Sequence, residues 1–101
     1  MAPKVIVRPS ALNDLAEIER WISERAGDDT ATAYGDRILD ACEALADFPY
    51  RGSPRGDLSR DIRTITFERS AIIAYVVQGD VVEVARILRR GRDIDSAINE
   101  N

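Results

Sequence analysis

The C-terminal third of the chain holds two long apolar runs, residues 70–78 and 81–88, separated only by Gly79-Asp80. A glycine-aspartate pair between runs rich in valine and isoleucine is typical of a two-residue β-hairpin turn. Both runs are apolar at most positions instead of at every second one, so the sheet they form has two apolar faces. Whatever else the chain folds into must cover both.

The rest of the chain supplies few elements for that purpose. Residues 4–8 predict a short strand, and apolar residues at helical spacing predict helices over 10–26 and 28–48, which end at Gly27 and Pro49. Residues 49–60 are rich in turn formers and predict a loop, and 61–67 predict another strand. We therefore expect one domain over residues 1–101, an α+β fold of order β-α-α-β-β-β. Its antiparallel sheet carries a two-helix hairpin on one face.

Two-residue turns at Glu68-Arg69 and Gly79-Asp80 would fix which side chains share a face. The helices most simply cover the face that includes Ile72 and Ile87. The opposite face would then expose Ile73, Val77, Val82, Val84 and Leu88. Burial of each such aliphatic side chain is worth roughly 1.5–3 kcal/mol, so we expect a protein partner to cover this face. The alternative is homodimerisation through it.

Composition excludes several classes of function. The chain has no histidine and a single cysteine, Cys42, so it lacks the usual ligands of a zinc site and the base of a serine–histidine triad. We expect no metal or cofactor. A net charge of −4 argues against general or direct specific DNA binding, and no apolar run is long enough to span a membrane. Cys42 lies on a predicted apolar helix stripe, which predicts a buried thiol, and the single cysteine favours the cytoplasm.

The remaining candidates for function are arginines. Five of them, together with a tyrosine of the hairpin, lie on or just beyond the predicted sheet: Arg63, Tyr75, Arg86, Arg89, Arg90 and Arg92. Arginine binds carboxylates and phosphates through two parallel N–H donors, so the group indicates recognition of an acidic partner or of phosphates. A solvated strand end, with these arginines paired to nearby aspartates, is the alternative.

Short motifs in order along nearly the whole chain resemble the RelE/ParE toxin superfamily. They are Leu15-Ala16-Glu17-Ile18, Cys42-Glu43-Ala44-Leu45 with Pro49 and Gly52, Asp61-Ile62-Arg63, Ile73-Ala74-Tyr75-Val76-Val77, and Val84-Ala85-Arg86-Ile87-Leu88-Arg89-Arg90-Gly91-Arg92-Asp93. The resemblance implies a toxin of a type II toxin–antitoxin pair. It also implies a cognate antitoxin with a DNA-binding N-terminus. The C-terminal segment of that antitoxin would wrap the toxin in a hetero-oligomer, which agrees with the uncovered sheet face expected above.

The resemblance leaves two activities to weigh. RelE-like members cleave messenger RNA on the ribosome with basic residues plus tyrosine or histidine, whereas ParE-like members inhibit DNA gyrase. Arg89 stands where many relatives have histidine, and arginine is too basic to accept a proton. We therefore expect gyrase inhibition by binding. We expect Arg86, Arg89, Arg90 and Arg92 to contact either gyrase or the antitoxin, with Arg63 and Tyr75 in support. The alternatives are a ribosome-dependent endoribonuclease, with Arg63 and Arg86 on the phosphate and Tyr75 near the hydroxyl, or a remnant that only binds its partner.

Overall fold

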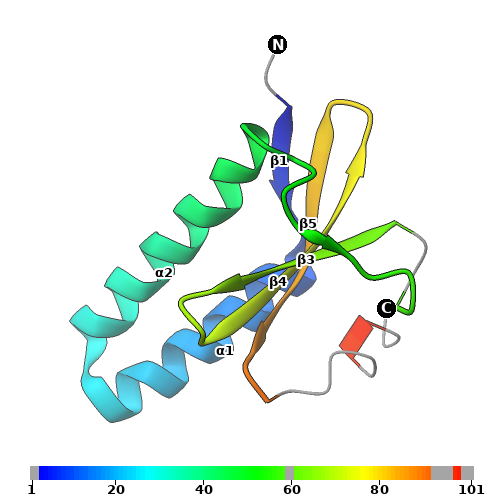
Figure 1. Cartoon of the computed structure of the whole chain (residues 1–101). Coiled ribbons are helices and arrows are strands. Elements are labelled where there is room, and N and C mark those ends of the chain that lie inside the picture. Colours follow the sequence, from blue (N-terminus) through cyan, green and yellow to red (C-terminus); the bar gives the residue numbers. More distant parts are fainter. Residues whose placement is uncertain (1–2, 59–60, 92–96, 99–101) are drawn as a thin grey trace.

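The computed structural model of the chain describes residues 3–58, 61–91 and 97–98, and its element order confirms the predicted α+β fold. The elements are β1 (Lys4–Val7), α1 (Pro9–Ala26), α2 (Asp28–Glu43), the 3-10 turn η1 (Ala44–Ala46), β2 (Ser53–Pro54), β3 (Ile62–Phe67), β4 (Ala71–Gln78) and β5 (Val81–Arg89). Figure 1 shows the two helices together on one side of the sheet.

The sheet has the strand order β1-β5-β4-β3-β2 and is mixed, whereas an antiparallel sheet was expected. Its first strand, β1, lies at one edge and pairs in parallel with the last, β5, with Val5 opposite Val82. A parallel pair needs a long connection, and here both helices and the strands β2, β3 and β4 lie between β1 and β5 in the chain. At the other edge the two-residue strand β2, within the segment predicted as a loop, pairs with β3.

The helices begin and end slightly differently from the sequence prediction. Helix α1 starts at Pro9, whose fixed φ angle suits a first helical position, and the Ser10 hydroxyl donates to the Ala85 carbonyl at 2.7 Å. Gly27 joins the two helices with a φ of 93°, in the region that favours glycine. Helix α2 ends at Glu43 instead of continuing to residue 48, so Phe48 is 69% exposed instead of packed on the stripe.

The main core lies between the helices and the sheet face that we expected to be uncovered. Side chains of both helices, of η1 and of β4 and β5 form one buried cluster, which includes Leu15, Ile18, Ile38, Cys42, Leu45, Ile73, Tyr75, Val82, Val84 and Ile87. Val77 packs against this cluster while partly buried. The prediction that Ile73, Val77, Val82 and Val84 face away from the helices is therefore wrong.

Two single-residue insertions explain the error. Phe67 pairs with Ala71, so Ser70 is left out of the ladder, where its hydroxyl shares a 2.8 Å hydrogen bond with that of Tyr34 on α2. Further along, Ala74 pairs with Arg86 but Tyr75 pairs with Val84, so β5 bulges at Ala85. Each extra residue reverses the alternation of side chains beyond it, because that alternation has a period of two.

The opposite face of the sheet is covered in part by the chain itself. Ile62, Ala74 and Val76 form a second, smaller cluster there, against which Leu58 and Ile98 pack. Leu88 alternates with the core residue Ile87, pairs with Ile72, and is only 2% exposed. The broad uncovered apolar face expected from the sequence is therefore not present in the part of the chain that the structure describes.

Two neighbouring isoleucines test this register. Replacement of Ile73, fully buried beneath the helices, by alanine leaves a cavity, and we expect the free energy of unfolding to fall by about 2–5 kcal/mol. The matched control is Ile72→Ala on the other face, where the side chain is half-buried and the loss is smaller. Urea unfolding followed by circular dichroism measures both. A larger loss for Ile72→Ala than for Ile73→Ala would contradict the observed register.

Candidate functional site

A buried ion pair lies at the centre of the predicted arginine cluster. The Arg86 guanidinium donates to both carboxylate oxygens of Asp14 on α1, at 2.7 and 2.9 Å, and also donates to the Ala97 carbonyl. The Ile87 backbone N–H donates to the same Asp14 carboxylate at 3.0 Å. Arg86 is only 6% exposed and Asp14 only 8%. Arg86 therefore holds helix, strand and C-terminal residues together from within the protein.

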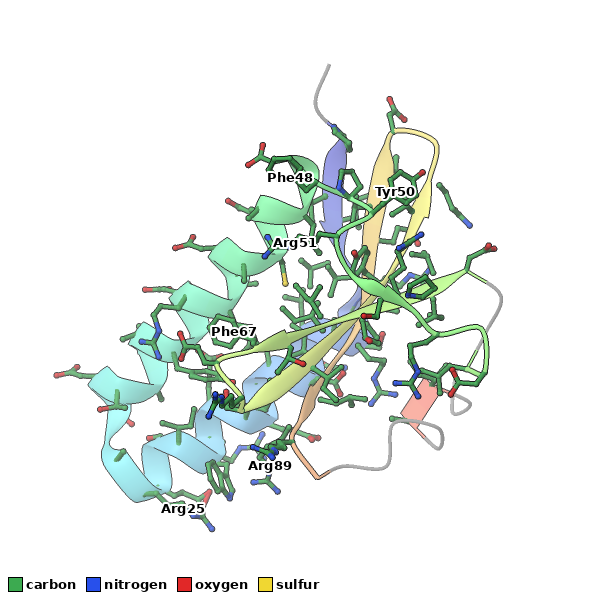
Figure 2. The ribbon with its side chains drawn as sticks, in the orientation of Figure 1. Arg25, Phe48, Tyr50, Arg51, Phe67 and Arg89 are labelled. Atoms are coloured by element: carbon green, nitrogen blue, oxygen red, sulfur yellow. The ribbon has the colours of Figure 1, made fainter. Side chains whose placement is uncertain are left out.

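Arg89 and Arg90 follow at the end of β5, and both are exposed. The Arg89 guanidinium lies 4.5 Å from the centroid of the Trp21 ring on α1, and that of Arg25 lies 4.4 Å from the same centroid. Figure 2 shows Arg25 and Arg89 at the same end of the molecule, from the end of α1 and the end of β5. Trp21 remains 40% exposed, so its ring and the two arginines form a surface available to a partner.

A groove of about 560 Å³ runs between α1 and the end of β5 beside this tryptophan. Its lining is Asp14, Glu17, Ile18, Arg20, Trp21, Glu24, Ile87, Leu88, Arg89, Arg90 and Gly91. The volume is in the range of sites that hold a small molecule or a few side chains of a protein partner. Since acidic and basic side chains both line the groove, it suits a polar, charged partner surface.

Tyr75 and Arg63 do not join this groove. Tyr75 is fully buried and its hydroxyl accepts a 2.9 Å hydrogen bond from the Gly52 N–H. Arg63 donates to the carbonyls of Tyr50 and Gly52, at 3.1 and 2.8 Å, and its guanidinium lies 5.0 Å from the Tyr50 ring centroid. Both side chains order the segment before β2. Arg92, the remaining predicted site residue, lies outside the described residues.

The sequence reasoning missed two exposed aromatic residues in that segment. Phe48 is 69% exposed and Tyr50 is 64% exposed, on either side of Pro49. Their signal in the sequence was their position: both flank a proline at a helix end, in a stretch with too few apolar neighbours to bury them. The predicted helix over 28–48 makes Phe48 its last residue instead.

The single cysteine of the chain lies in the core. Cys42 is fully buried, as predicted, and burial together with the nearby Glu43 charge raises the pKa of its thiol to about 11, far from that of a nucleophile. Among residues 3–58, 61–91 and 97–98, no three metal-ligating side chains gather in one place. In the same residues no helix is long and apolar enough to cross a bilayer.

The fold and the groove together define a small α+β protein with a charged surface suited to a macromolecular partner. A solved structure described as the chromosomal ParDE TA system from P. aeruginosa contains a chain with the same fold. The TM-score is 0.77 at 22% sequence identity, over 87% of this chain and 96% of that one. A search of curated protein sequences finds no significant match.

The family itself is shown by sequence. The profile of the ParE toxin of type II toxin–antitoxin systems, parDE, matches residues 5–94. The chain therefore belongs to the ParE toxin family, which confirms the toxin branch expected from its motifs.

The buried ion pair gives a direct test of how the groove is built. Replacement of Asp14 by alanine removes the buried carboxylate that accepts from both the Arg86 guanidinium and the Ile87 N–H, and we expect the free energy of unfolding to fall by about 3–5 kcal/mol. The control is Glu68→Ala, which breaks the exposed ion pair with Arg37 and changes stability little. Equal effects of the two substitutions in denaturant unfolding would rule out the structural role of Asp14.

Proposed function

We propose that this toxin inhibits DNA gyrase by binding it, without catalysis, and that a cognate antitoxin neutralises it in the cytoplasm. The observation that carries the proposal is the burial of Tyr75 and Arg86. These are two of the three residues that a ribonuclease mechanism would need at the surface.

A ribonuclease must place a proton acceptor at a ribose 2′-hydroxyl and a cation at the phosphate. Tyr75 is fully buried and its hydroxyl is held by the Gly52 N–H. Arg86 lies inside the protein on Asp14. The chain has no histidine to take over proton transfer. These features favour inhibition by binding over cleavage of ribosome-bound message.

The groove between α1 and β5 is the proposed contact with gyrase. Arg89 and Arg90 are exposed at its rim, and Trp21 with Arg25 extends the surface along α1. Arginine and tryptophan are among the residues that most often dominate the energy of protein interfaces. Arg92, two residues further along the chain, is included in the proposed contact because of its place in the sequence.

The proposed neutralising partner is a small antitoxin with a DNA-binding N-terminus, and together the two form a hetero-oligomer. Family membership supports this, because the family is defined as the toxin of a type II toxin–antitoxin system. The similar chain from P. aeruginosa was solved in a structure whose description names the ParDE system.

Supercoiling by purified gyrase tests the proposal. We expect the chain to inhibit supercoiling, and the double variant Arg89→Glu, Arg90→Glu to lose at least about tenfold in potency, the effect of 1.4 kcal/mol of binding energy. The control is Arg37→Ala, which removes an exposed arginine on α2, away from the groove, and keeps wild-type potency.

A parallel assay of ribosome-bound message separates the rival activity. Cleavage of that message with normal supercoiling would overturn the proposal in favour of the endoribonuclease. Absence of any effect in both assays would favour a remnant that only binds its partner.

A further inference from the structure

We propose that Phe48, Tyr50 and Arg51 form a second docking surface, here called the aromatic loop (residues 48–52), which binds an acidic and apolar segment of the antitoxin. This inference rests on the proposed function in that an antitoxin is the partner, but it assigns a surface distinct from the groove. In Figure 2, Phe48, Tyr50 and Arg51 lie at the end of the molecule opposite Arg25 and Arg89.

The aromatic loop carries the two most exposed large hydrophobic side chains of the described residues. Phe48 is 69% exposed and Tyr50 64%, compared with 47% for the next, Leu12. Scattered single apolar residues are normal on a protein surface, but two exposed aromatic residues within three positions of the chain, followed by an arginine, match the composition of interface cores.

The loop is held rigidly although its aromatic side chains are not buried. Three sets of hydrogen bonds fix its backbone. The Gly52 N–H donates to the buried Tyr75 hydroxyl, and the Arg63 side chain donates to the carbonyls of Tyr50 and Gly52. The Arg51 N–H donates to the Phe48 carbonyl at 3.1 Å. Gly52 is required there, since an added Cβ would lie 2.5 Å from the Tyr75 hydroxyl oxygen. A surface ordered before binding loses less entropy when a partner arrives.

Two arginines, Arg51 and Arg63, lie beside the aromatic rings, against one acidic neighbour in the sequence, Asp47, and neither arginine forms an ion pair among the described residues. Arg51 is exposed and makes no ion pair there, while the Arg63 side chain donates to carbonyls instead of to an acid. A partner segment with Asp or Glu beside bulky apolar side chains therefore complements the surface. Nucleic acid is a poorer match, because the chain as a whole carries a charge of −4.

The apolar character of the surface assigns it to the antitoxin and not to gyrase. Long-lived complexes bury more apolar surface than transient ones. The aromatic loop presents two large rings, whereas the groove mixes acidic and basic side chains. The two surfaces lie at opposite ends of the molecule (Figure 2). The antitoxin can therefore bind the aromatic loop without making the contacts that gyrase makes in the groove.

The test measures the affinity of the purified chain for the antitoxin encoded beside its gene, by isothermal titration or surface plasmon resonance. We expect the double variant Phe48→Ser, Tyr50→Ser to raise Kd at least about 30-fold, the effect of one hot-spot residue, and Arg51→Glu to raise it about tenfold. The matched control is Leu12→Ser, an exposed apolar residue of α1, for which we expect wild-type affinity.

A further variant tests the rigidity of the loop. Tyr75→Phe keeps every surface side chain but removes the acceptor of the Gly52 N–H. We expect faster hydrogen exchange at the Gly52 amide and a several-fold higher Kd for the antitoxin, with the fold retained by circular dichroism. Unchanged exchange at Gly52 would contradict the anchoring role.

Gyrase inhibition is measured with the same variants. We expect all aromatic-loop variants to inhibit supercoiling like the wild type, while the antitoxin protects gyrase from them less well. Unchanged antitoxin affinity would overturn the proposal. Loss of gyrase inhibition with antitoxin binding intact would also overturn it and would assign the loop to gyrase. A wild-type dimer in sedimentation that the double variant abolishes would overturn it as well and would assign the loop to a second copy of the chain. If the wild type does not inhibit gyrase, the proposed function fails but the affinity measurement still decides this inference.

Discussion

The hydrogen bonds around Asp14 connect the parts of this fold that the functional surface depends on. One carboxylate accepts two N–H groups from Arg86 and one from the backbone of Ile87, and Arg86 also reaches the carbonyl of Ala97. A buried ion pair is tolerated only when most of its hydrogen-bonding capacity is satisfied, because desolvation of both charges is costly. Here the hydrogen bonds of Asp14 with Arg86 and Ile87 hold helix α1 against β5 in one register.

The β-bulge at Ala85 is what makes this arrangement possible. It leaves Arg86 on the face opposite the main core and returns Ile87 to that core, so the next residue on the helix side is Arg89, which contacts Trp21. Ser10 donates to the Ala85 carbonyl at the bulge. Bulges commonly redirect side chains near functional sites, and this one separates a structural arginine from an exposed one three residues later.

Local patterns predicted the elements of the fold, but not the pairing between them. Apolar periodicity located both helices and the three long strands, and Gly27 marked the junction between the helices, whereas Pro49 lies six residues beyond the end of α2. The extra residues Ser70 and Ala85 gave no sequence signal: a serine looks like an ordinary turn residue, and an alanine continues an apolar run. Both are held by contacts with distant helices, from Tyr34 and Ser10, which a one-dimensional pattern does not contain. The same holds for the parallel pairing of β1.

The candidate site was predictable only as a cluster of arginines. Arg86 and Arg89 are alike in sequence. The bulge at Ala85 and the position of Asp14 on α1, 72 residues before Arg86, make one internal and leave the other exposed. Arg86 is therefore structural, and under the proposed function we expect Arg89 to contact gyrase.

Side-chain Nε–H signals in a ¹⁵N-labelled sample, recorded with and without gyrase, test this most directly. We predict that the Arg86 signal exchanges slowly and does not move, whereas the Arg89 signal shifts on binding. Rapid exchange of Arg86, or a shift of Arg86 with Arg89 unmoved, would contradict the account.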